Sequence, residues 1–175
     1  MSEILLNKPS FKGNEWKYVQ ECIDTEWVSS AGGYVELFEK KIAKYTKSKN
    51  AIACVNGTSA LQLSLKLAGV ISGDEVIVPP LTMSAPAFAV LQANATPVFA
   101  DVDSDTFQIS AASIAERVTS KTRAIIAVAL YGSSPDMDPI MEIAKKNNLF
   151  VIEDNAECFL GLYKGKIVGT IVSRK

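Results

Sequence analysis

The chain of 175 residues contains no histidine. This absence excludes Ser-His-Asp and Cys-His nucleophilic systems, and most catalytic zinc sites, because those sites commonly depend on an imidazole. Any proton transfer must therefore use a carboxylate, a lysine, a tyrosine or a group that belongs to a cofactor.

Cysteine, excess charge and long apolar runs are also scarce. The three cysteines, Cys22, Cys54 and Cys158, are widely spaced without a Cys-x-x-Cys pair, so we expect reduced thiols in a cytoplasmic protein, with Cys54 in the core. The net charge of −1 gives no basic surface for nucleic acid. No apolar run reaches the length of a membrane span, and the first residues lack a signal-peptide pattern. We expect neither nucleic acid nor a membrane as a partner.

The composition is that of an ordinary globular domain, with 48% hydrophobic and 21% charged residues. From residue 51 onward, short apolar runs alternate with helix-like stretches, which predicts βαβ units and a parallel sheet covered on both faces. Helices are predicted over residues 11–27 and 34–47 from apolar residues spaced three or four apart, and both are expected to pack through those stripes. The expected strands are 51–55, 75–78, 96–100, 124–130 and 149–152; the expected core helices are 59–68, 86–93, 113–118 and 137–146; and a hairpin is expected over 159–168.

Residues 149–158 carry the most informative stretch, in which four apolar residues run directly into an acidic cluster. In open parallel sheets, ligands bind at the carboxyl ends of buried strands. Asp154 and Glu157 are therefore candidates for chemistry. The alternative is that Glu153 and Asp154 only end a strand and begin a turn.

A second candidate lies between the strand predicted at 51–55 and the following helix. Gly57 lets the backbone approach a bound group closely, and the free amides at the start of a helix favour an anion such as a phosphate. The hydroxyls of Thr58 and Ser59 are further donors. The alternative is that Thr58 or Ser59 only caps the helix.

Other polar loops follow the predicted strands. Met83 is expected either above the same crevice or as a gap-filling core residue, and Ser84 can cap the next helix. Tyr131 is a candidate to line the pocket, whereas Asp136 is expected to cap a helix with Asp138 in its first turn.

Two further loops, at residues 101–105 and 29–33, contain polar residues or glycines that could contact a ligand. Residues 101–105 resemble the opening of a calcium loop, but Thr106 and Ala112 stand where glycine and glutamate are needed, so a turn is predicted. The loop at 29–33 is a weaker candidate for ligand contact.

An anion cradle at 57–60 and a carboxylate at 154 suit a ligand with a phosphate at one end and a basic ring nitrogen elsewhere. Pyridoxal 5′-phosphate has this shape, since a carboxylate can keep its pyridine nitrogen protonated so that the ring acts as an electron sink. The sequence therefore favours this cofactor.

Seven ordered motifs, from about residue 10 onward, resemble those of the DegT/StrS family of pyridoxal-phosphate-dependent aminotransferases of nucleotide-linked keto sugars. The resemblance implies a fold-type I large domain, a three-layer α/β/α structure with a mostly parallel sheet, incomplete at the C-terminus, with N-terminal helices at 10–48 and a core at 51–171. It also implies a homodimer that transfers an amino group from glutamate to a keto sugar for polysaccharide or lipopolysaccharide synthesis. The motifs lie at 27–38, 56–61, 78–82, 97–103, 130–138, 151–156 and 163–169.

By position, the resemblance implies that Gly57, Thr58 and Ser59 hold the cofactor phosphate and that Asp154 pairs with the pyridinium nitrogen. Three positions depart from the family pattern and indicate a distinct subgroup. Glu157 stands where glutamine is frequent near the cofactor's 3-hydroxyl, Met83 where an aromatic ring is frequent, and Ala129 where histidine is frequent.

The family's Schiff-base lysine lies beyond the last matching motif, and Lys175 is too early to be that lysine. We therefore expect a truncated form that lacks turnover by itself. One alternative is a non-catalytic remnant or cofactor-binding interaction module. A second alternative, a Rossmann-type oxidoreductase, lacks the G-x-G-x-x-G fingerprint.

Overall fold

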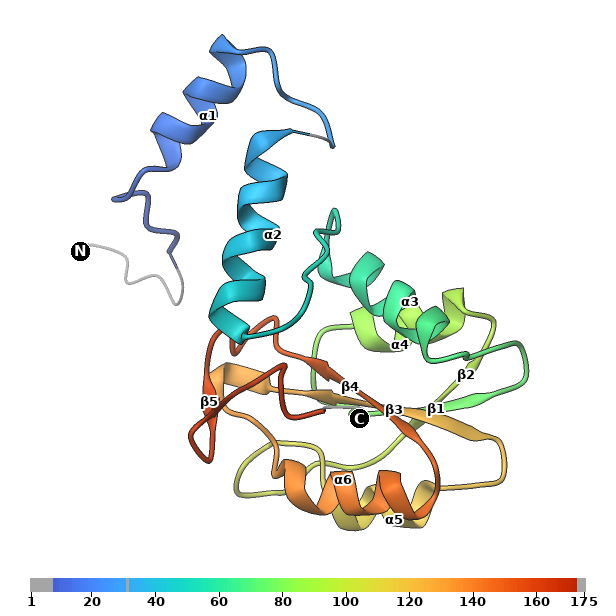
Figure 1. Ribbon diagram of the computed structural model, residues 1–175. Coiled ribbons are helices and arrows are strands. Elements are labelled where there is room, and N and C mark those ends of the chain that lie inside the picture. Colours follow the sequence, from blue (N-terminus) through green and yellow to red (C-terminus); the bar gives the residue numbers. More distant parts are fainter. Residues whose placement is uncertain (1–7, 31, 173–175) are drawn as a thin grey trace, which may run out of the picture.

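The computed structural model describes residues 8–30 and 32–172 and contains a four-stranded parallel sheet (Figure 1). The strand order is β2-β1-β3-β4, with β1 at Glu75–Val78, β2 at Thr96–Phe99, β3 at Thr122–Val128 and β4 at Phe150–Asp154. All three strand pairs are parallel, as the alternation of strands and helices predicts.

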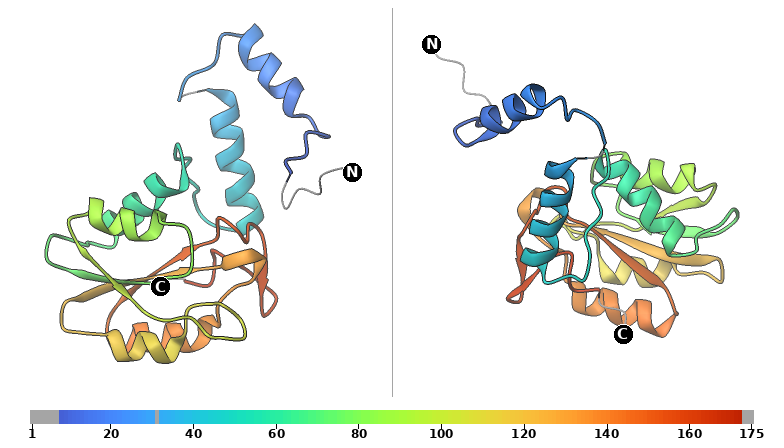
Figure 2. Two further views of the ribbon diagram at one scale, coloured as in Figure 1. Left: turned by 180° about the vertical axis from the view of Figure 1, so that it is seen from behind. Right: turned by 45° about the horizontal axis from the view of Figure 1, so that its top comes forward.

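Helices cover both faces of the sheet, as Figures 1 and 2 show. One face carries α3 (Gly57–Leu67) and α4 (Ala85–Gln92), and the other carries α5 (Ala111–Arg117) and α6 (Met137–Lys146). Successive strand side chains alternate between two cores, because Val76 and Val78 pack with α3 and α4 whereas Ile77 packs with α5 and α6. The sheet is thus the middle layer of three.

Strand β4 differs from its prediction in burial and in length. Val151 is its one fully buried residue, because β4 has a partner strand on one side within the described sheet. The strand also continues to Asp154, two residues further than expected, with Val128 as the register partner of Asp154. Glu153 and Asp154 therefore belong to the strand itself.

The strand predicted at 51–55 is wrong, since this segment has no regular structure. The amide of Ala53 donates to Glu39 Oε1 at 2.8 Å, so a side chain takes the place of a neighbouring strand. Val55 is 88% exposed, and Cys54 is exposed rather than in the core. The apolar composition of the segment fits a strand, but within residues 8–30 and 32–172 no strand lies beside it to complete the pairing.

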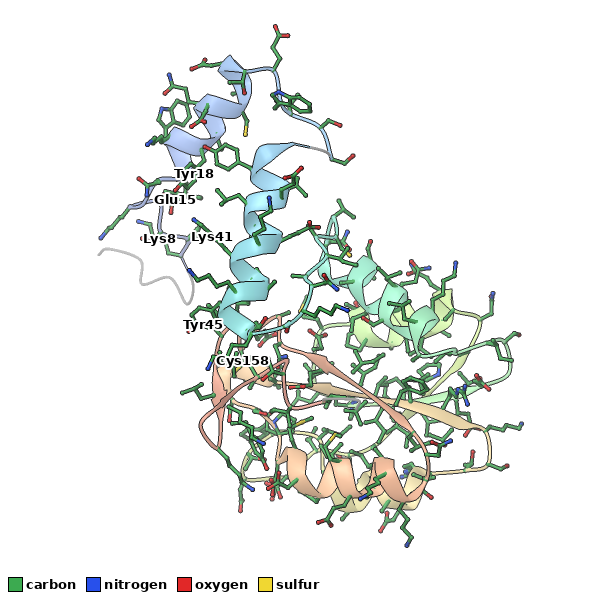
Figure 3. All side chains as sticks on the ribbon, viewed as in Figure 1. Lys8, Glu15, Tyr18, Lys41, Tyr45 and Cys158 are labelled. Carbon is green, nitrogen blue, oxygen red and sulfur yellow. The ribbon has the colours of Figure 1, made fainter. Side chains whose placement is uncertain are left out.

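The two N-terminal helices, α1 (Glu15–Asp24) and α2 (Gly33–Thr46), project away from the sheet (Figure 1). Tyr34 donates its hydroxyl hydrogen to Glu21 Oε2 at 2.8 Å, and this bond raises the pKa of Tyr34 to about 12. Figure 3 shows Tyr18 in the space between the helices, with its ring centroid 5.2 Å from that of Tyr34. These two contacts join α1 to α2, while Glu39 of α2 accepts from the Ala53 amide on the core side.

The expected packing of the apolar stripe on α1 is not observed. Trp16 is 76% exposed, Val19 and Ile23 are also exposed, and α1 buries no residue completely. The helix ends three residues earlier than predicted because Glu26 has a positive φ, which an α-helix does not accommodate. This end of the molecule leaves a large apolar surface uncovered.

The remaining elements follow their predictions closely. Helix α6 has the predicted bounds, whereas β3 ends at Val128 because residues Leu130–Gly132 form the separate 3₁₀ turn η1. The predicted hairpin is confirmed as β5 (Leu162–Tyr163) and β6 (Lys166–Ile167). Its turn residues, Lys164 and Gly165, both have positive φ, which matches the right-handed twist of a two-residue hairpin.

The hairpin is attached to the start of α6 by polar contacts. The Tyr163 hydroxyl donates to Asp136 Oδ1 and accepts from the Asp138 amide at 3.1 Å, while Lys164 Nζ lies 2.5 Å from Asp138 Oδ2. Asp136 occupies the N-cap position, as predicted. Its side chain makes no hydrogen bond to the first amides of α6, so the predicted side-chain cap is wrong. Its carboxylate binds the tyrosine instead.

Candidate functional site

A cavity of about 560 Å³ lies where α3 begins and β4 ends. Gly57 and Asp154 both line it, although 97 positions separate them in the sequence. Its remaining walls come from α2, from the irregular segment before Gly57, and from the chain on either side of the hairpin: Phe38, Thr46, Ile52–Cys54, Asn56, Ala60, Leu61, Ser64, Ile152, Glu153, Asn155, Ala156, Phe159, Leu160, Val168 and Gly169.

Helix α3 is capped by Asn56, which precedes both of the caps considered from the sequence, Thr58 and Ser59. Asn56 has extended backbone angles, and its Oδ1 accepts from the Ser59 amide at 2.9 Å. The alternative that Thr58 or Ser59 only caps this helix is therefore wrong. Within residues 8–30 and 32–172, the amides of Gly57 and Thr58 have no hydrogen-bond partner. These two donors remain available for an anion.

The space beside Gly57 is open. A Cβ placed on Gly57 would meet no heavy atom within 4 Å, so a ligand can approach the backbone there. The positive end of the α3 dipole lies at the same point and favours a negative charge. Free amides, open space and the helix dipole are the features that suit an anion such as a phosphate.

Asp154, which also lines the cavity, is half-buried. Its Oδ1 accepts from the Ala156 amide at 3.2 Å, and its carbonyl oxygen accepts from the Ala129 amide at 2.9 Å. Burial raises the pKa of the Asp154 carboxyl, the charge of Glu157 raises it further, and the Ala156 amide lowers it. A cation beside Asp154 would offset this cost of ionisation.

Glu157 supports the turn after β3. Its Oε2 accepts from the Tyr131 amide at 3.1 Å, and Tyr131 has a left-handed φ of 53°. Gln108, which the sequence analysis did not single out, holds the same turn from the buried side, with bonds of 3.0 Å to the Leu130 oxygen and 3.2 Å from the Leu130 amide. Its sequence context, beside an aspartate-rich turn, gives no signal of this role.

Four of the six predicted cofactor-binding residues do not line the cavity: Thr58, Ser59, Met83 and Glu157. Met83 is 69% exposed in the loop between β1 and α4, so it does not fill a gap in the core. Ser84 precedes α4 without a side-chain cap bond. The roles of these four residues toward a cofactor stay predictions, whereas Gly57 and Asp154 share the cavity.

Glu153 is a second residue whose contacts the sequence analysis did not foresee. Its carboxylate accepts three backbone hydrogen bonds, from the amides of Gly169, Ile171 and Val172. It does more than end a strand, because it attaches the chain after the hairpin to β4.

The other sequence candidates lie elsewhere. Gly32 and Gly33 line a separate cavity of about 280 Å³ between α1 and α2, while Ala31 and Lys175 lie outside the described residues. A hollow of about 630 Å³ beside α6 is lined mostly by apolar side chains and lacks the convergent polar groups of a cofactor site.

The predicted aspartate turn is confirmed, because Asp103 Oδ1 accepts from the amides of Asp105 and Thr106. In the part of the chain that the structure describes, no group of three or more acidic, cysteine or histidine residues is placed to hold a metal ion. No helix in that part is long and apolar enough to cross a membrane.

These features fit pyridoxal phosphate. The cavity volume lies within the usual range for small ligands, roughly 300–1,000 Å³. Two unpaired amides and a helix dipole suit the phosphate, and a half-buried carboxylate suits a protonated ring nitrogen.

The fold is that of the fold-type I pyridoxal-phosphate transferases. A crystal structure of the aminotransferase from Psychrobacter cryohalolentis superposes with a TM-score of 0.88 at 43% identity, covering 92% of this chain and 41% of that one. GDP-4-keto-6-deoxymannose-3-dehydratase with a trapped PLP-glutamate geminal diamine superposes with a TM-score of 0.84 at 29% identity, covering 93% and 44%.

Residues 9–174 match the model of the DegT/DnrJ/EryC1/StrS aminotransferase family, and the chain belongs to this family. GDP-perosamine synthase of Escherichia coli O157:H7 is 48% identical over 170 residues, covering 97% of this chain and 47% of the relative. The chain thus spans about half the length of its curated relatives. Family membership removes the Rossmann-type oxidoreductase from consideration.

Proposed function

We propose that this chain is the cofactor-binding part of a pyridoxal-phosphate-dependent aminotransferase that acts on nucleotide-linked keto sugars. The observation that carries this proposal is that Gly57 and Asp154 line one cavity. Residues 1–175 are proposed to form part of a single large domain, with the helices at 10–48 and the core at 51–171 as its segments.

Each residue of the site has a distinct task in this proposal. The amides of Gly57 and Thr58 hold the phosphate, and the Ser59 hydroxyl is a further donor. Asp154 holds a proton on the ring nitrogen by supplying the nearby negative charge. When bound, the cofactor supplies an electron sink for the transfer of an amino group. Met83 is proposed to cover one face of the ring, and Glu157 to lie near its 3-hydroxyl group.

The proposed substrates are a nucleotide-linked keto sugar and an amino donor, glutamate in our proposal. The similarity to GDP-perosamine synthase supports a sugar substrate. Another relative, 39% identical over 163 residues, is a spore coat polysaccharide biosynthesis protein of Bacillus subtilis, which supports a role in polysaccharide synthesis. A cytoplasmic location is proposed as well, in keeping with free Cys22, Cys54 and Cys158.

We further propose that the functional form is a homodimer. Exposed large apolar residues gather on α1, on α2 and on the loop that joins them, a concentration that in soluble proteins marks an interaction surface. They include Trp16, Val19, Ile23, Trp27, Val28, Leu37 and Phe38.

Turnover is proposed to need a lysine that these 175 residues do not supply, and a non-catalytic remnant that still binds cofactor is the second candidate. The direct test adds pyridoxal phosphate to the purified chain, follows its absorbance and circular dichroism, and then applies borohydride. We expect saturable binding that is lost in Asp154→Ala, without reduction onto one specific lysine. Absence of saturable binding by the unmodified chain would overturn the proposal, and mass mapping of the label to a single lysine would overturn the expectation of a missing lysine.

A further inference from the structure

Glu153 binds three backbone amides at once. Its Oε2 accepts from Gly169 at 2.7 Å, and its Oε1 accepts from both Ile171 and Val172 at 3.0 Å. Hydrogen bonds to a charged acceptor are roughly twice as strong as neutral ones. A single half-buried carboxylate on β4 therefore holds a segment 16 to 19 positions further along the chain.

Within residues 8–30 and 32–172, the amides of Gly169, Ile171 and Val172 have no other hydrogen-bond partner. Among the described residues, the intervening Thr170 bonds only to Ile167, three residues before it. Glu153 is thus the polar connection between this segment and the sheet. Without that connection, residues 169–172 would depend on the packing of the partly buried Ile171 and Val172 and on the buried Val168 before them, a condition typical of locally mobile chain.

The segment that Glu153 holds forms one wall of the cofactor cavity. Val168 and Gly169 line the cavity together with Gly57 and Asp154. Gly169 approaches the opposite loop closely, because a Cβ added there would lie 3.2 Å from Asn155 Nδ2. The position of this wall therefore depends on where the Glu153 carboxylate places the Gly169 amide.

We propose that Glu153, which lines the cavity beside Asp154, is a positioning residue that acts on the cofactor site through the backbone amides it holds. Its carboxylate fixes residues 169–172, of which Gly169 lines the cavity, and so sets the affinity of the site for a phosphorylated pyridine. This inference rests on the proposed function, and it assigns separate tasks to neighbouring carboxylates: Asp154 faces the ring nitrogen, and Glu153 holds the wall.

The test compares pyridoxal phosphate binding by the full chain and by Glu153→Ala, Glu153→Gln and Glu116→Gln. Glu116 is an exposed residue of α5 and provides a matched change of charge. We expect Glu153→Ala to raise the dissociation constant about 10-fold or more, because the three hydrogen bonds to the charged carboxylate are lost. Glu153→Gln should lose less affinity for pyridoxal phosphate, since its remaining side-chain oxygen can still accept from the Ile171 and Val172 amides. Glu116→Gln should bind the cofactor as tightly as the unmodified chain does.

Two readouts separate positioning from general destabilisation. The circular dichroism of the bound cofactor reports the shape of the cavity in folded molecules and should change in the order Glu116→Gln, Glu153→Gln, Glu153→Ala. Hydrogen exchange at Gly169, Ile171 and Val172 should accelerate in Glu153→Ala. If Glu153→Ala does not fold, the dichroism and the hydrogen exchange are both measured on Glu153→Gln. In that variant only the hydrogen bond from the Gly169 amide is expected to be lost.

The outcomes are distinct. If the unmodified chain binds no pyridoxal phosphate, the proposed function fails, and this inference fails with it. If the unmodified chain binds while Glu153 variants bind with equal affinity and the same dichroism, only the positioning role is overturned. Unchanged exchange at the three amides would also overturn it, because the carboxylate would then not be holding the segment.

Discussion

Asp154 ionises at a cost in the ligand-free chain. Burial raises the pKa of this carboxyl above its ordinary value, and the negative charge of Glu157 raises it further. The folded chain therefore binds a proton at Asp154 more tightly than the unfolded chain does, so this group's contribution to stability is greatest at low pH and declines as pH rises through the raised pKa. The positive charge of a protonated pyridine ring beside Asp154 would favour the ionised carboxylate and so reverse this cost of ionisation.

We predict opposite effects of Asp154→Asn on stability and on binding. At neutral pH the variant should unfold at a higher urea concentration than the unmodified chain, because asparagine removes the cost of ionisation and keeps an oxygen for the Ala156 amide. The difference should vanish at low pH, where Asp154 is protonated. Affinity for pyridoxal phosphate should fall about 10-fold or more. Urea unfolding between about pH 4 and pH 8 and a cofactor titration measure both effects.

The control for this prediction is Asp24→Asn, an exposed aspartate at the end of α1. It should change neither the pH dependence of unfolding nor cofactor affinity. A destabilised Asp154→Asn at neutral pH, or a stability difference that does not depend on pH, would contradict this account of Asp154.

A pair of glycine substitutions tests the cavity wall at the same scale. Gly169 has a φ of +84°, and an added Cβ would lie 3.2 Å from Asn155 Nδ2, whereas Gly33 at the start of α2 has no neighbour within 4 Å and a φ that other residues tolerate. We predict that Gly169→Ala lowers the free energy of unfolding by about 1–2 kcal/mol, because alanine disfavours this left-handed backbone. Gly33→Ala should leave it unchanged within about 0.5 kcal/mol. Equal effects of the two substitutions would count against the described wall.

At the scale of elements, the hairpin β5–β6 depends on its contacts with the start of α6. The Lys164 ammonium lowers the pKa of Asp138, so this attraction is present above the ordinary aspartate pKa and is lost as pH falls through the lowered value. The pair is solvent-exposed and contributes little by itself. The Tyr163 hydroxyl, which joins Asp136 to the Asp138 amide, is the more specific connection.

We predict that Tyr163→Phe loosens the hairpin without unfolding the domain. Loss of the two hydroxyl contacts should cost about 1 kcal/mol. Trypsin should then cleave after Lys164 or Lys166 several times faster than in the unmodified chain, while the urea midpoint changes little. Tyr45→Phe, on the exposed side of α2, is the control. Similar cleavage rates in both variants would show that the hydroxyl does not hold the hairpin.

Local patterns were sufficient to predict most of the core elements. Strands β1 and β3 are apolar on both faces because they are buried between helices, and α6 has a complete amphipathic period with turn residues at its ends. The segment at 51–55 has equally apolar residues, but it is irregular because none of the strands that the structure describes lies beside it. The local spacing of apolar residues does not determine which distant segments pair as strands.

The same distinction applies to the candidate site. Gly57 and Asp154 could be recognised because each comes directly after or near the end of a short apolar run, where a glycine or an aspartate is chemically distinctive. Glu153 could not, since its three partners lie beyond a hairpin whose position depends on Tyr163 and α6. Gln108 was missed for the same reason, because its partner Leu130 is 22 positions away.

At the scale of the whole molecule, α1 and α2 leave apolar side chains in solvent while the α/β core is covered on both faces of its sheet. An exposed face of this size is more typical of an interface than of a free surface. In the proposed homodimer, a second copy of the chain would cover Trp16, Trp27 and their neighbours, which are exposed in the single chain.

We predict that Trp16→Glu weakens self-association at least tenfold, because a charge would replace a large apolar side chain within the proposed interface. Ala115→Glu, an exposed position on α5 at the other end of the molecule, should not. Analytical ultracentrifugation over a range of concentrations measures the change. A monomeric unmodified chain, or equal dimerisation of Trp16→Glu, would contradict a homodimer formed through these helices.

The central claim is that the start of α3 and the end of β4 hold opposite ends of one phosphorylated pyridine. The most direct measurement is a two-dimensional ¹H–¹⁵N NMR titration of the labelled chain with pyridoxal phosphate. We predict that the amides of Gly57 and Thr58 and that of Ala156, which donates to Asp154, shift together with a single dissociation constant. Shifts at only one of these two places, or at neither while other residues respond, would contradict the claim.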